Sequence, residues 1–426
     1  MGDLDSCFRV SDERVTVADA VKRFAGGIEA AAGIETAATA GALGRILAED
    51  IVARLDTPPH DNSAVDGYAV YFDDLTADGE TRLGVTGRIA AGHPLGREAR
   101  RGEALQIFTG APMPSGDNDP GPDTIFMVED CKLEDGALIL PAGIKRGANR
   151  RRAGEDVKAG AVVLKAGTRL RPQDIAMAAS LGYAEIPVYR RLSVAVFSTG
   201  DEVREPGAPL DTGCIYDANR FAIMAMLERL GCQVRDLGIF PDDRAVIQDA
   251  VAAAAAGHDL LMTSGGVSRG EEDHVRASVE ALGAVHFWNL AIKPGRPIAL
   301  GYVEADGKKT PFVGLPGNPV AVMVTFLKIA RPIVLLLEGA GSEEPTLFKV
   351  AAGFDYEKKP GRREWLRASL ARGDNGALTA NKYSEDGSGI ISSMVAADGL
   401  IELDEELTCV RQGEMVDFLP FNEVMG

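Results

Sequence analysis

The sequence predicts a multidomain protein that combines an α/β part with β-rich parts. Its 426 residues exceed the usual size of one domain, and a chain of this length is expected to contain about three domains. From Arg191 to about Leu337, apolar strands alternate with helices of about a dozen residues, which is typical of a parallel sheet covered on both faces. Short β-rich runs broken by glycine and proline occupy about Val52 to Gly160 and the region after Gly339. They predict a small antiparallel domain and a terminal β-barrel-like domain.

Helices are predicted in the segments around the first β-rich region. Apolar residues recur at helical spacing from Thr16 to Ala31. A second helix-like block extends from about Thr36 to Ile51. After the β-rich region, Pro172 is expected in the first turn of a helix that runs to Leu181.

The α/β part and the C-terminal part can each be divided into elements. In the α/β part we predict strands and helices at Leu192–Ser198, Asp217–Leu230, Gln233–Phe240, Asp243–Ala256 and Asp259–Thr263, in alternating order and starting with a strand. A helix, a strand and a helix then follow. In the C-terminal part we predict short strands at Leu347–Ala351, Leu366–Leu370, Ala377–Ala380 and Gly399–Leu403.

Composition narrows the class of protein. Hydrophobic residues make up 46% and charged residues 25% of the chain, which is ordinary for a soluble globular protein. A formal net charge of −18 argues against nucleic acid or an anionic membrane as the main partner. The N-terminus has no apolar signal core and no stretch reaches the roughly 20 apolar residues of a membrane span, so we expect a cytoplasmic protein. The five cysteines are scattered, which indicates neither a zinc site nor a disulfide framework.

A glycine turn at the end of one predicted strand is the first candidate binding site. Leu260–Met262 runs into Ser264-Gly265-Gly266, where backbone N–H groups can approach an anion because no Cβ stands in the way. A ligand at the carboxyl end of a strand is expected in an open α/β sheet. Ser268 adds a hydroxyl, and the carboxylates of residues 271–273 suit a hard cation between them and an oxyanion. The alternative is a tight turn before an exposed acidic helix start.

Other polar stretches can be added to this candidate site. They are Asp61–Val70, Thr109–Pro114, Arg150–Asp156, Ser198–Glu202, Ile292–Pro297 and Gly314–Pro319. Ser198–Glu202 follows a parallel strand and is expected on the same rim as the glycine turn. Lys293 and Arg296, together with free N–H groups near Gly317 and Asn318, are expected to form a local anion site in an acidic protein. For each stretch alone the alternative is a solvated Pro/Gly turn.

Seven of these motifs occur in one order that resembles a known family. The motifs are DNSAVDGYAV, TGAPMP, RRAGEDV, STGDE, SGGVSRGEEDH, LAIKPGRP and GLPGNPV. The chain resembles the molybdopterin molybdenumtransferases, the MoeA-type proteins related to the gephyrin E domain, from about Val10 to its C-terminus. The resemblance implies that the chain places molybdenum from molybdate on the dithiolene of adenylylated molybdopterin, with release of AMP and the assistance of Mg²⁺.

The resemblance also implies a domain division and a dimer. The four implied domains are an α/β molybdopterin-binding domain at 10–29 and 191–340, a linking α+β domain at 30–52 and 161–190, an inserted β-rich domain at 53–160 and a C-terminal β-domain at 341–426. The implied homodimer joins the sheet domain of one chain to the inserted domain of the other at a shared active site. Adenylylated molybdopterin and molybdate are the implied binding partners, with no nucleic acid and no membrane.

Site residues follow from the matched motif positions. The implied catalytic residues are Asp66, Thr109, Asp156, Glu202, Ser268 and Asp273. The implied substrate-binding residues are Gly265, Gly266, Lys293, Pro316, Pro319, Arg367 and Ser388, and the implied metal ligands are Asp242 and Asp273. The chain departs from the family pattern at Asn289 and Arg296, where lysines are frequent, and at Ala321, where serine is common. These departures concern the oxyanion side of the site.

Two other functions were weighed against cofactor assembly. The first is the molybdopterin adenylyltransferase, which has a related sheet domain and a similar SGG loop but lacks the additional β-domains. The second is a non-catalytic cofactor storage or scaffold protein, including a gephyrin-like organiser. The sequence leaves open molybdenum versus tungsten, the protein that receives the cofactor and the existence of a paralogue.

Overall fold

The computed structural model describes residues 4–9, 14–265, 274–341, 344–373 and 376–425. The chain divides into two compact units. The first comprises residues 1–49, 166–171 and 186–426, and the second comprises residues 50–165 and 172–185. The first unit holds an α/β sheet and a C-terminal barrel, and the second holds a separate β-sheet.

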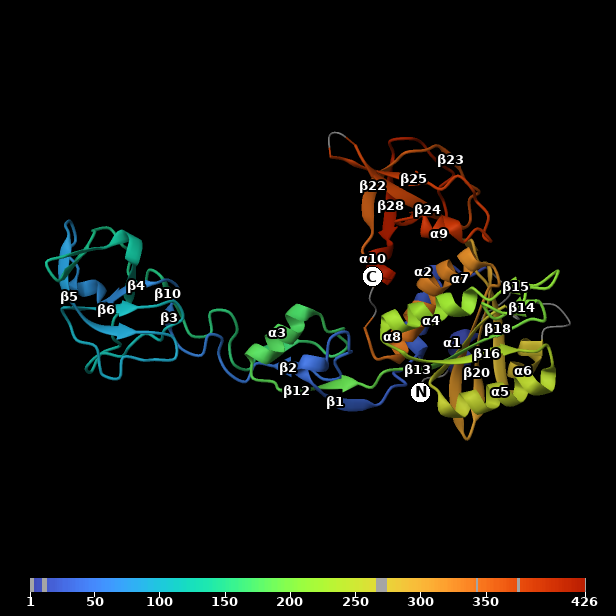
Figure 1. Ribbon diagram of the computed structural model, residues 1–426, viewed down its shortest axis with the longest axis horizontal. Coiled ribbons are helices and arrows are strands. Elements are labelled where there is room, and N and C mark those ends of the chain that lie inside the picture. Colours follow the sequence, from blue (N-terminus) through green and yellow to red (C-terminus); the bar gives the residue numbers. More distant parts are fainter. Residues whose placement is uncertain (1–3, 10–13, 266–273, 342–343, 374–375, 426) are drawn as a thin grey trace. The chain divides into compact units, whose positions relative to one another are not determined.

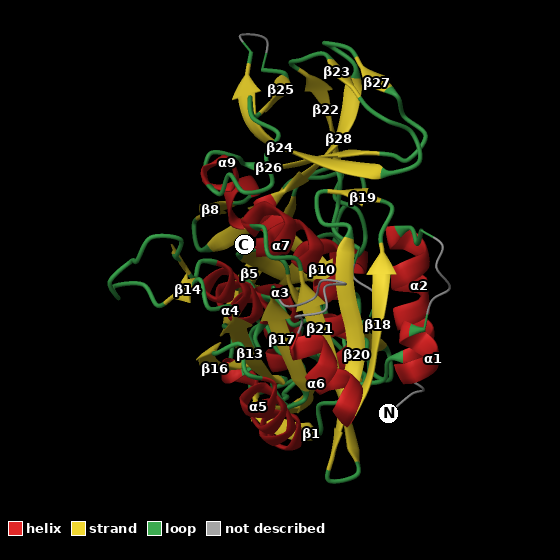
Figure 2. Ribbon diagram, turned by 90° about the vertical axis from the view of Figure 1, so that its right-hand side faces the viewer, coloured by secondary structure: helices red, strands yellow, loops and turns green. Residues whose placement is uncertain are grey.

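A six-stranded mixed sheet forms the centre of the α/β part (Figure 2). Its strands, in spatial order, are β16 (Gln233–Phe240), β13 (Ser193–Thr199), β17 (Leu260–Ser264), β21 (Lys308–Leu315), β20 (Pro297–Ala305) and β18 (Gly283–Asn289). The first four strands are parallel, as predicted. The last two pairings are antiparallel: β20 and β21 form a hairpin across Ala305↔Lys308, and β18 then pairs antiparallel with β20.

Helices cover both faces of this sheet. On β13, Val194 and Val196 belong to one buried cluster, whereas Ala195 and Phe197 belong to the other. This alternation is the two-residue period of a strand buried on both sides. The first face packs against α4 (Asn219–Leu230), α7 (Pro319–Thr325), α8 (Arg331–Leu337) and α2 (Val17–Gly27), and the second packs against α5 (Arg244–Gly257) and α6 (His274–Leu282). The short helix α1 (Leu4–Phe8) contributes Phe8 to the first face.

The helices of this region agree with the sequence prediction in start and end signals. Asp243 caps α5 by accepting hydrogen bonds from the amides of Ala245 and Val246. Gly231 ends α4 in the left-handed conformation at φ +95°. Arg169 and Arg191 donate to the carbonyls of Leu230 and Gly231, which satisfies the last turn of α4.

The helical stretch Pro319–Leu337 comprises α7, a π-helical segment η4 (Phe326–Ala330) and α8. The most apolar 18-residue window of this 19-residue stretch has a mean hydropathy of 2.1, so by length and composition it could cross a membrane, contrary to the expectation from the sequence. However, 78% of its most apolar window is buried inside the protein. Its side chains belong to the core beneath the sheet.

Two predictions about secondary structure were wrong. The block from Thr36 to Ile51 is not a helix: it contains β1 (Ile34–Ala38), a 3₁₀ turn η1 (Thr39–Gly41) and the start of β2 (Ile51–Val52). β1 pairs with β12 (Glu185–Tyr189), and β2 pairs with β11 (Val162–Leu164). Between α6 and α7 the chain forms β18, the two-residue strand β19 (Ile292–Lys293), β20 and β21, where only one strand was expected.

The C-terminal part closes into a five-stranded barrel. The strands pair in the cycle β24 (Arg363–Arg372), β25 (Leu378–Lys382), β22 (Phe348–Ala352), β28 (Met415–Pro420), β26 (Gly399–Leu403) and back to β24. Four of these strands were predicted, and β28 was not. The short strands β23 (Tyr356–Glu357) and β27 (Cys409–Val410) pair outside the cycle, and the short helices α9 (Ser392–Val395) and α10 (Phe421–Met425) complete this part. The predicted fold class is confirmed.

The second unit holds the other six-stranded sheet, drawn in blue and cyan in Figure 1. Its spatial order is β7 (Thr124–Met127), β4 (Gly67–Val70), β6 (Glu103–Ile107), β5 (Thr81–Ile89), β9 (Ala137–Leu140) and β8 (Lys132–Glu134). All neighbours are antiparallel except β5 and β6. The small ladder of β3 (Asn62–Ser63) and β10 (Arg150–Arg151) and the 3₁₀ turns η2 (Phe72–Asp74) and η3 (Val128–Asp130) belong to this unit. Helix α3 (Pro172–Ser180) begins at Pro172, as predicted.

Candidate functional site

Two acidic loops lie together at the carboxyl ends of β13 and β16. The amide of Asp201 donates to a carboxylate oxygen of Asp242 at 3.3 Å, and the amide of Asp242 donates to Asp201 at 3.4 Å. Glu202 follows Asp201 and is exposed. Gly200 has φ +133°, a backbone conformation that residues with a Cβ rarely adopt, so the turn favours glycine. The predicted residues Glu202 and Asp242 therefore occupy neighbouring loops on one rim.

The glycine turn after β17 belongs to the same rim. Gly265 has φ +78°, and its amide donates to the carbonyl of Leu315 at the end of β21. The other predicted residues of this turn, Gly266, Ser268 and Asp273, lie outside the described residues. Asn219 at the start of α4 donates to the carbonyl of Gly317 at 2.7 Å. This bond holds the loop that Pro316 and Pro319 were predicted to shape.

A buried arginine braces the loop that follows Glu202. Arg220 is 1% exposed and donates to the carboxylates of Asp217, Asp236 and Glu205. Asp217 is itself buried, so the guanidinium and this carboxylate neutralise each other away from water. The loop after β13 is thereby joined to β16.

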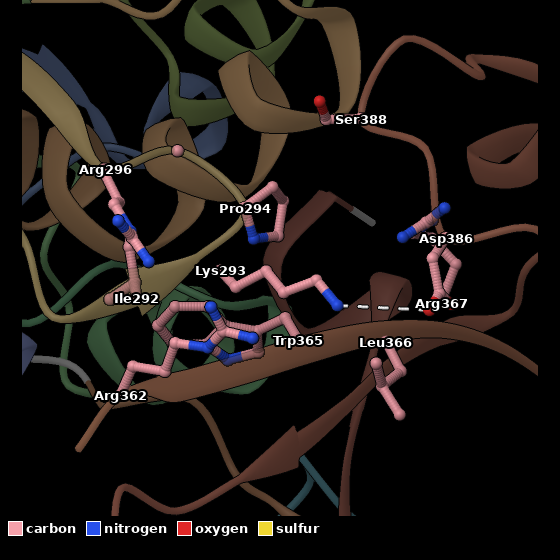
Figure 3. Close-up of a pocket in the computed structure, with 11 residues that line it drawn as sticks. Ile292, Lys293, Pro294, Arg296, Arg362, Trp365, Leu366, Arg367, Asp386 and Ser388 are labelled. Atoms are coloured by element: carbon pink, nitrogen blue, oxygen red, sulfur yellow. Dashed lines mark ion pairs between the residues drawn. The ribbon is translucent and has the colours of Figure 1, made fainter. Parts of the chain in front are cut away.

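A basic pocket lies between the α/β part and the barrel of the first unit (Figure 3). It has a volume of about 300 Å³. Its lining includes four cationic residues and one acid, namely Lys293, Arg296, Arg362, Arg367 and Asp386. Ser388 and Pro294 also line it. The predicted residues Lys293, Arg367 and Ser388 are thus brought to one cavity.

The ammonium of Lys293 is held by residues of the barrel. It donates to the hydroxyl of Tyr356 at 3.1 Å and lies 3.5 Å from the carboxylate of Glu364. Tyr356 in turn donates to Glu364 at 2.8 Å, and burial together with this carboxylate raises the pKa of Tyr356 above its usual range. Arg362 binds the other oxygen of Glu364 at 2.7 Å. Tyr356, Glu364 and Arg362 were not predicted from the sequence.

Arg367 holds the segment on the other side of the pocket. It is buried, and it donates to the hydroxyl of Ser393 at 3.0 Å and to the carbonyls of Glu385 and Gly387 at 2.8 and 3.2 Å. Burial lowers the pKa of its guanidinium, although not enough to discharge it at neutral pH. The carbonyl of Ser388 accepts from the amide of Val320, which fixes the same segment against α7.

In the second unit, Asp66 and Thr109 form one contact. The backbone amide and the hydroxyl of Thr109 both donate to Asp66 Oδ1, at 2.8 and 2.7 Å. These two bonds lower the pKa of the Asp66 carboxyl below 3.8. Both residues are exposed, so this polar group is accessible to a ligand.

Two other aspartates of the second unit fix the loop of Arg150–Asp156 and the residues just after it. The carboxylate of Asp61 accepts from Arg150 and from the amide of Ala153. Asp56 accepts from the amide of Ala159 at 2.8 Å. Asp156 is exposed on this loop, and its amide donates to the carbonyl of Thr57 at 3.0 Å. Asp66, Thr109 and Asp156 therefore belong to the second unit, and the other described site residues belong to the first.

Family models match most of the chain. Residues 15–182 match the MoeA N-terminal region (domain I and II), residues 195–335 a probable molybdopterin binding domain, and residues 349–421 the MoeA C-terminal region (domain IV). A molybdopterin molybdenumtransferase from Haemophilus influenzae is 41% identical over 387 residues, which cover 90% of this chain and 93% of that protein. The chain belongs to the MoeA family.

Further relatives of this MoeA-family chain agree. A molybdopterin molybdenumtransferase from Nostoc is 36% identical over 332 residues, covering 77% of this chain and 75% of that protein. The crystal structure of the molybdopterin biosynthesis moeA protein from Pyrococcus horikoshii matches with a TM-score of 0.80 and 29% identity, over 96% of this chain and 100% of that one. The resemblance inferred from the seven motifs is confirmed.

Proposed function

We propose that this chain is a molybdopterin molybdenumtransferase of molybdenum cofactor biosynthesis. It takes adenylylated molybdopterin and molybdate, places molybdenum on the dithiolene and releases AMP. The observation that carries this proposal is the basic pocket around Lys293 and Arg367, which lies in a protein of net charge −18. Molybdate is a tetrahedral dianion, and charge-assisted hydrogen bonds from lysine, arginine and serine are the interactions that hold such an anion.

The alternatives explain less of the chain. A probable molybdopterin binding domain accounts for residues 195–335 only, whereas the N-terminal and C-terminal MoeA regions account for residues 15–182 and 349–421. The pocket is built partly from the barrel, which the adenylyltransferase reading leaves without a role. A storage protein would need no clustered acids on the sheet rim.

The site residues are assigned by their chemistry. Lys293, Arg367 and Ser388 bind molybdate, and the N–H groups of Gly265 and Gly266 and the loop of Pro316 and Pro319 bind the nucleotide substrate. Asp66, Thr109, Asp156 and Glu202 orient the substrate, with Ser268 and Asp273 beside them. Cleaving a phosphoanhydride requires charge neutralisation and positioning more than a strong base, which suits this set.

Mg²⁺ fits the donor set on the rim. The carboxylates of Asp242 and Asp201 each accept a hydrogen bond from the other residue's backbone amide, and oxygen ligands are those that Mg²⁺ prefers. Among the residues that the structure describes, no group of three metal-ligating side chains converges, and Asp273 is outside them. Asp242 and Asp273 would hold the ion, which when bound neutralises phosphate charge. Asp201 is the additional residue that we assign to this group.

The enzyme is proposed to be a cytoplasmic homodimer with the active site shared between chains. The support is that Asp66 and Thr109 belong to a different compact unit from Glu202 and Asp242. The four-domain division at 10–29 with 191–340, 30–52 with 161–190, 53–160 and 341–426 also stays a prediction.

The activity is tested with purified protein, Mg²⁺, molybdate and adenylylated molybdopterin. AMP should be released, and the product should activate an apo-molybdoenzyme. Lys293→Gln should lose activity at low molybdate, whereas Lys349→Gln, which removes an exposed lysine of the barrel, should not. No AMP release under conditions where a related active enzyme succeeds would overturn the assignment. Parallel assays with tungstate measure the metal preference.

The shared site is tested by mixing inactive chains. Asp66→Asn and Glu202→Gln are unfolded and refolded together, so that about half of the dimers carry one of each. If one site takes Asp66 from one chain and Glu202 from the other, each mixed dimer has one intact site, and roughly a quarter of the activity returns. If both residues come from one chain, no activity returns.

A further inference from the structure

Asp386 is an acid in a pocket that otherwise carries positive charge. Its side chain is 50% exposed, and its carboxylate lies 2.7 Å from the ammonium of Lys382. The ammonium of Lys293 is 3.9 Å away (Figure 3). Burial raises the pKa of this carboxyl, but Lys382, Lys293 and Arg367 outweigh burial and hold the pKa below its usual value. Asp386 is therefore ionised at neutral pH, and its charge opposes the entry of an anion.

The main chain around Asp386 is anchored by Arg367, whereas its half-exposed carboxylate is held by the ammonium of Lys382. Arg367 donates to the carbonyls on either side, those of Glu385 and Gly387. The half-exposed carboxylate lies nearer to Lys382, at 2.7 Å, than to Lys293, at 3.9 Å. The ring of Tyr356 lies beside both lysines, with its centroid 5.8 Å from the ammonium of Lys293 and 5.7 Å from that of Lys382.

Glu364, the second acid near Lys293, is held differently. It is fully buried and bound by Arg362 and by the hydroxyl of Tyr356. Moving its carboxylate away from these partners would leave a buried charge unpaired, which is energetically costly. Lys293 thus has one permanent counter-ion and one that can be exchanged. The other one, Asp386, is already hydrogen-bonded to a second lysine, Lys382.

We propose that Asp386 is an internal competitor for the oxyanion and sets the affinity of the pocket. In the empty pocket its carboxylate partly neutralises Lys293. When a tetrahedral dianion binds, Asp386 pairs wholly with Lys382, and Lys293 is released to the ligand. This inference rests on the proposed role of the pocket as the molybdate site, and it assigns a specificity-determining role to a residue that the motifs did not indicate.

The charge of the ligand gives this mechanism a signature. Coulomb energy is proportional to the charge of the ligand, so removing a nearby negative charge helps a dianion twice as much, in free energy, as a monoanion of the same shape. If Asp386→Asn binds molybdate about tenfold more tightly, it should bind perrhenate, a tetrahedral monoanion, only about threefold more tightly. A steric effect of the substitution would change both by the same factor.

The experiment is equilibrium dialysis of the full-length protein with molybdate and with perrhenate. Asp386→Asn should lower the Kd for molybdate by about tenfold, and this gain should shrink as salt is added. Lys382→Gln removes the second lysine, leaves Asp386 on Lys293 and should raise the Kd. Asp417→Asn, which removes an exposed acid paired with Lys349 on the same barrel, is the matched control and should change neither Kd.

Each result decides the question. An unchanged or higher Kd for molybdate in Asp386→Asn overturns the inference. A lower Kd for molybdate in Lys382→Gln also overturns it. Absence of binding in all the variants also overturns it, whereas binding that appears only in Asp386→Asn supports it. AMP release is measured separately: if it succeeds while Asp386→Asn binds like the natural chain, only the inference fails. Tighter binding without AMP release overturns the proposed function alone.

Discussion

Thr109 donates two hydrogen bonds to a single carboxylate oxygen of Asp66, one from its amide and one from its hydroxyl. The two residues are 43 positions apart, and β4 and β6 bring them together because Gly67 pairs with Ile107. Asp66 directly precedes β4, and Thr109 lies two residues after the end of β6. The sheet of the second unit therefore orients the Asp66 carboxylate.

The first prediction concerns this contact. The pKa of Asp66 is lower in the folded chain than the ordinary value of 3.8. Its hydrogen bonds therefore stabilise the fold fully when the pH is above 3.8, and this stabilisation is lost as the pH falls through the folded-state pKa. Thr109→Val removes the hydroxyl donor and should raise the pKa of Asp66, as measured by NMR titration of the carboxyl carbon. Thr109→Ser keeps the donor and should leave it unchanged. Asp66→Asn should reduce AMP release by at least about tenfold.

The second prediction concerns Arg220. Arg220→Met leaves the buried carboxylate of Asp217 without its counter-ion, which should cost about 3–5 kcal/mol of unfolding free energy. Urea unfolding followed by circular dichroism measures this loss. The control is Lys349→Met, whose exposed pair with Asp417 should be worth less than about 1 kcal/mol. Equal losses in the two variants would contradict the role of Arg220.

The third prediction concerns the close approach of β4 and β7. A Cβ on Gly67 would lie 1.7 Å from the carbonyl oxygen of Phe126, so Gly67→Ala must separate the two strands. We expect a loss of about 1–3 kcal/mol and a weaker Asp66–Thr109 contact. Gly84→Ala is the control in the same sheet, because its Cβ would meet nothing closer than 4.0 Å. Thermal unfolding of both variants measures the difference.

The fourth prediction is a pH dependence. Burial raises the pKa of Glu103, but hydrogen bonds from Arg97, Thr86 and the amide of Arg100 outweigh burial and bring it to about 2. The resulting stabilisation is fully present above the unfolded value of 4.5 and is lost as the pH falls from there to about 2.

Glu103→Gln is the variant that checks this dependence. It should be less stable than the natural chain at pH 7, and the gap should close by about pH 2. Arg97→Met removes the arginine partner of Glu103. It should make the midpoint of thermal unfolding depend less on pH in the same acid range. The midpoints of thermal unfolding across this pH range are the measurement, and a gap that stays constant with pH would contradict the assignment.

Local signals in the sequence predicted the elements whose ends are marked by specific residues. Asp243 and Gly231 mark the start of α5 and the end of α4, and Pro172 starts α3. Thr36–Ile51 was misread as a helix because alanine and leucine favour helices, whereas the pairing of β1 with β12, about 150 residues away, decides the structure. Tertiary pairing of this kind leaves no signal in a short window.

The candidate site was predicted at positions that match the family and missed at the side chains that support them. Lys293, Arg367 and Ser388 were expected near an oxyanion, and all three line one cavity. Tyr356 and Glu364 lie in no recognised motif. They contact Lys293 because β19 pairs with β24, which is distant in the sequence. Asp386 is only two positions before Ser388, and this proximity was the one signal that could have drawn attention to it.

The parallel pairing of β19 with β24 has a consequence for dissecting the protein. Ile292 pairs with Arg363 and Lys293 pairs with Glu364. This short backbone pairing joins residues more than 60 positions apart, and Ile292 and Lys293 both line the cavity. Neither the region before residue 340 nor the barrel after it contains a whole anion receptor. Cutting the chain between them should abolish oxyanion uptake even if both fragments fold, and only a reassembled pair should recover it.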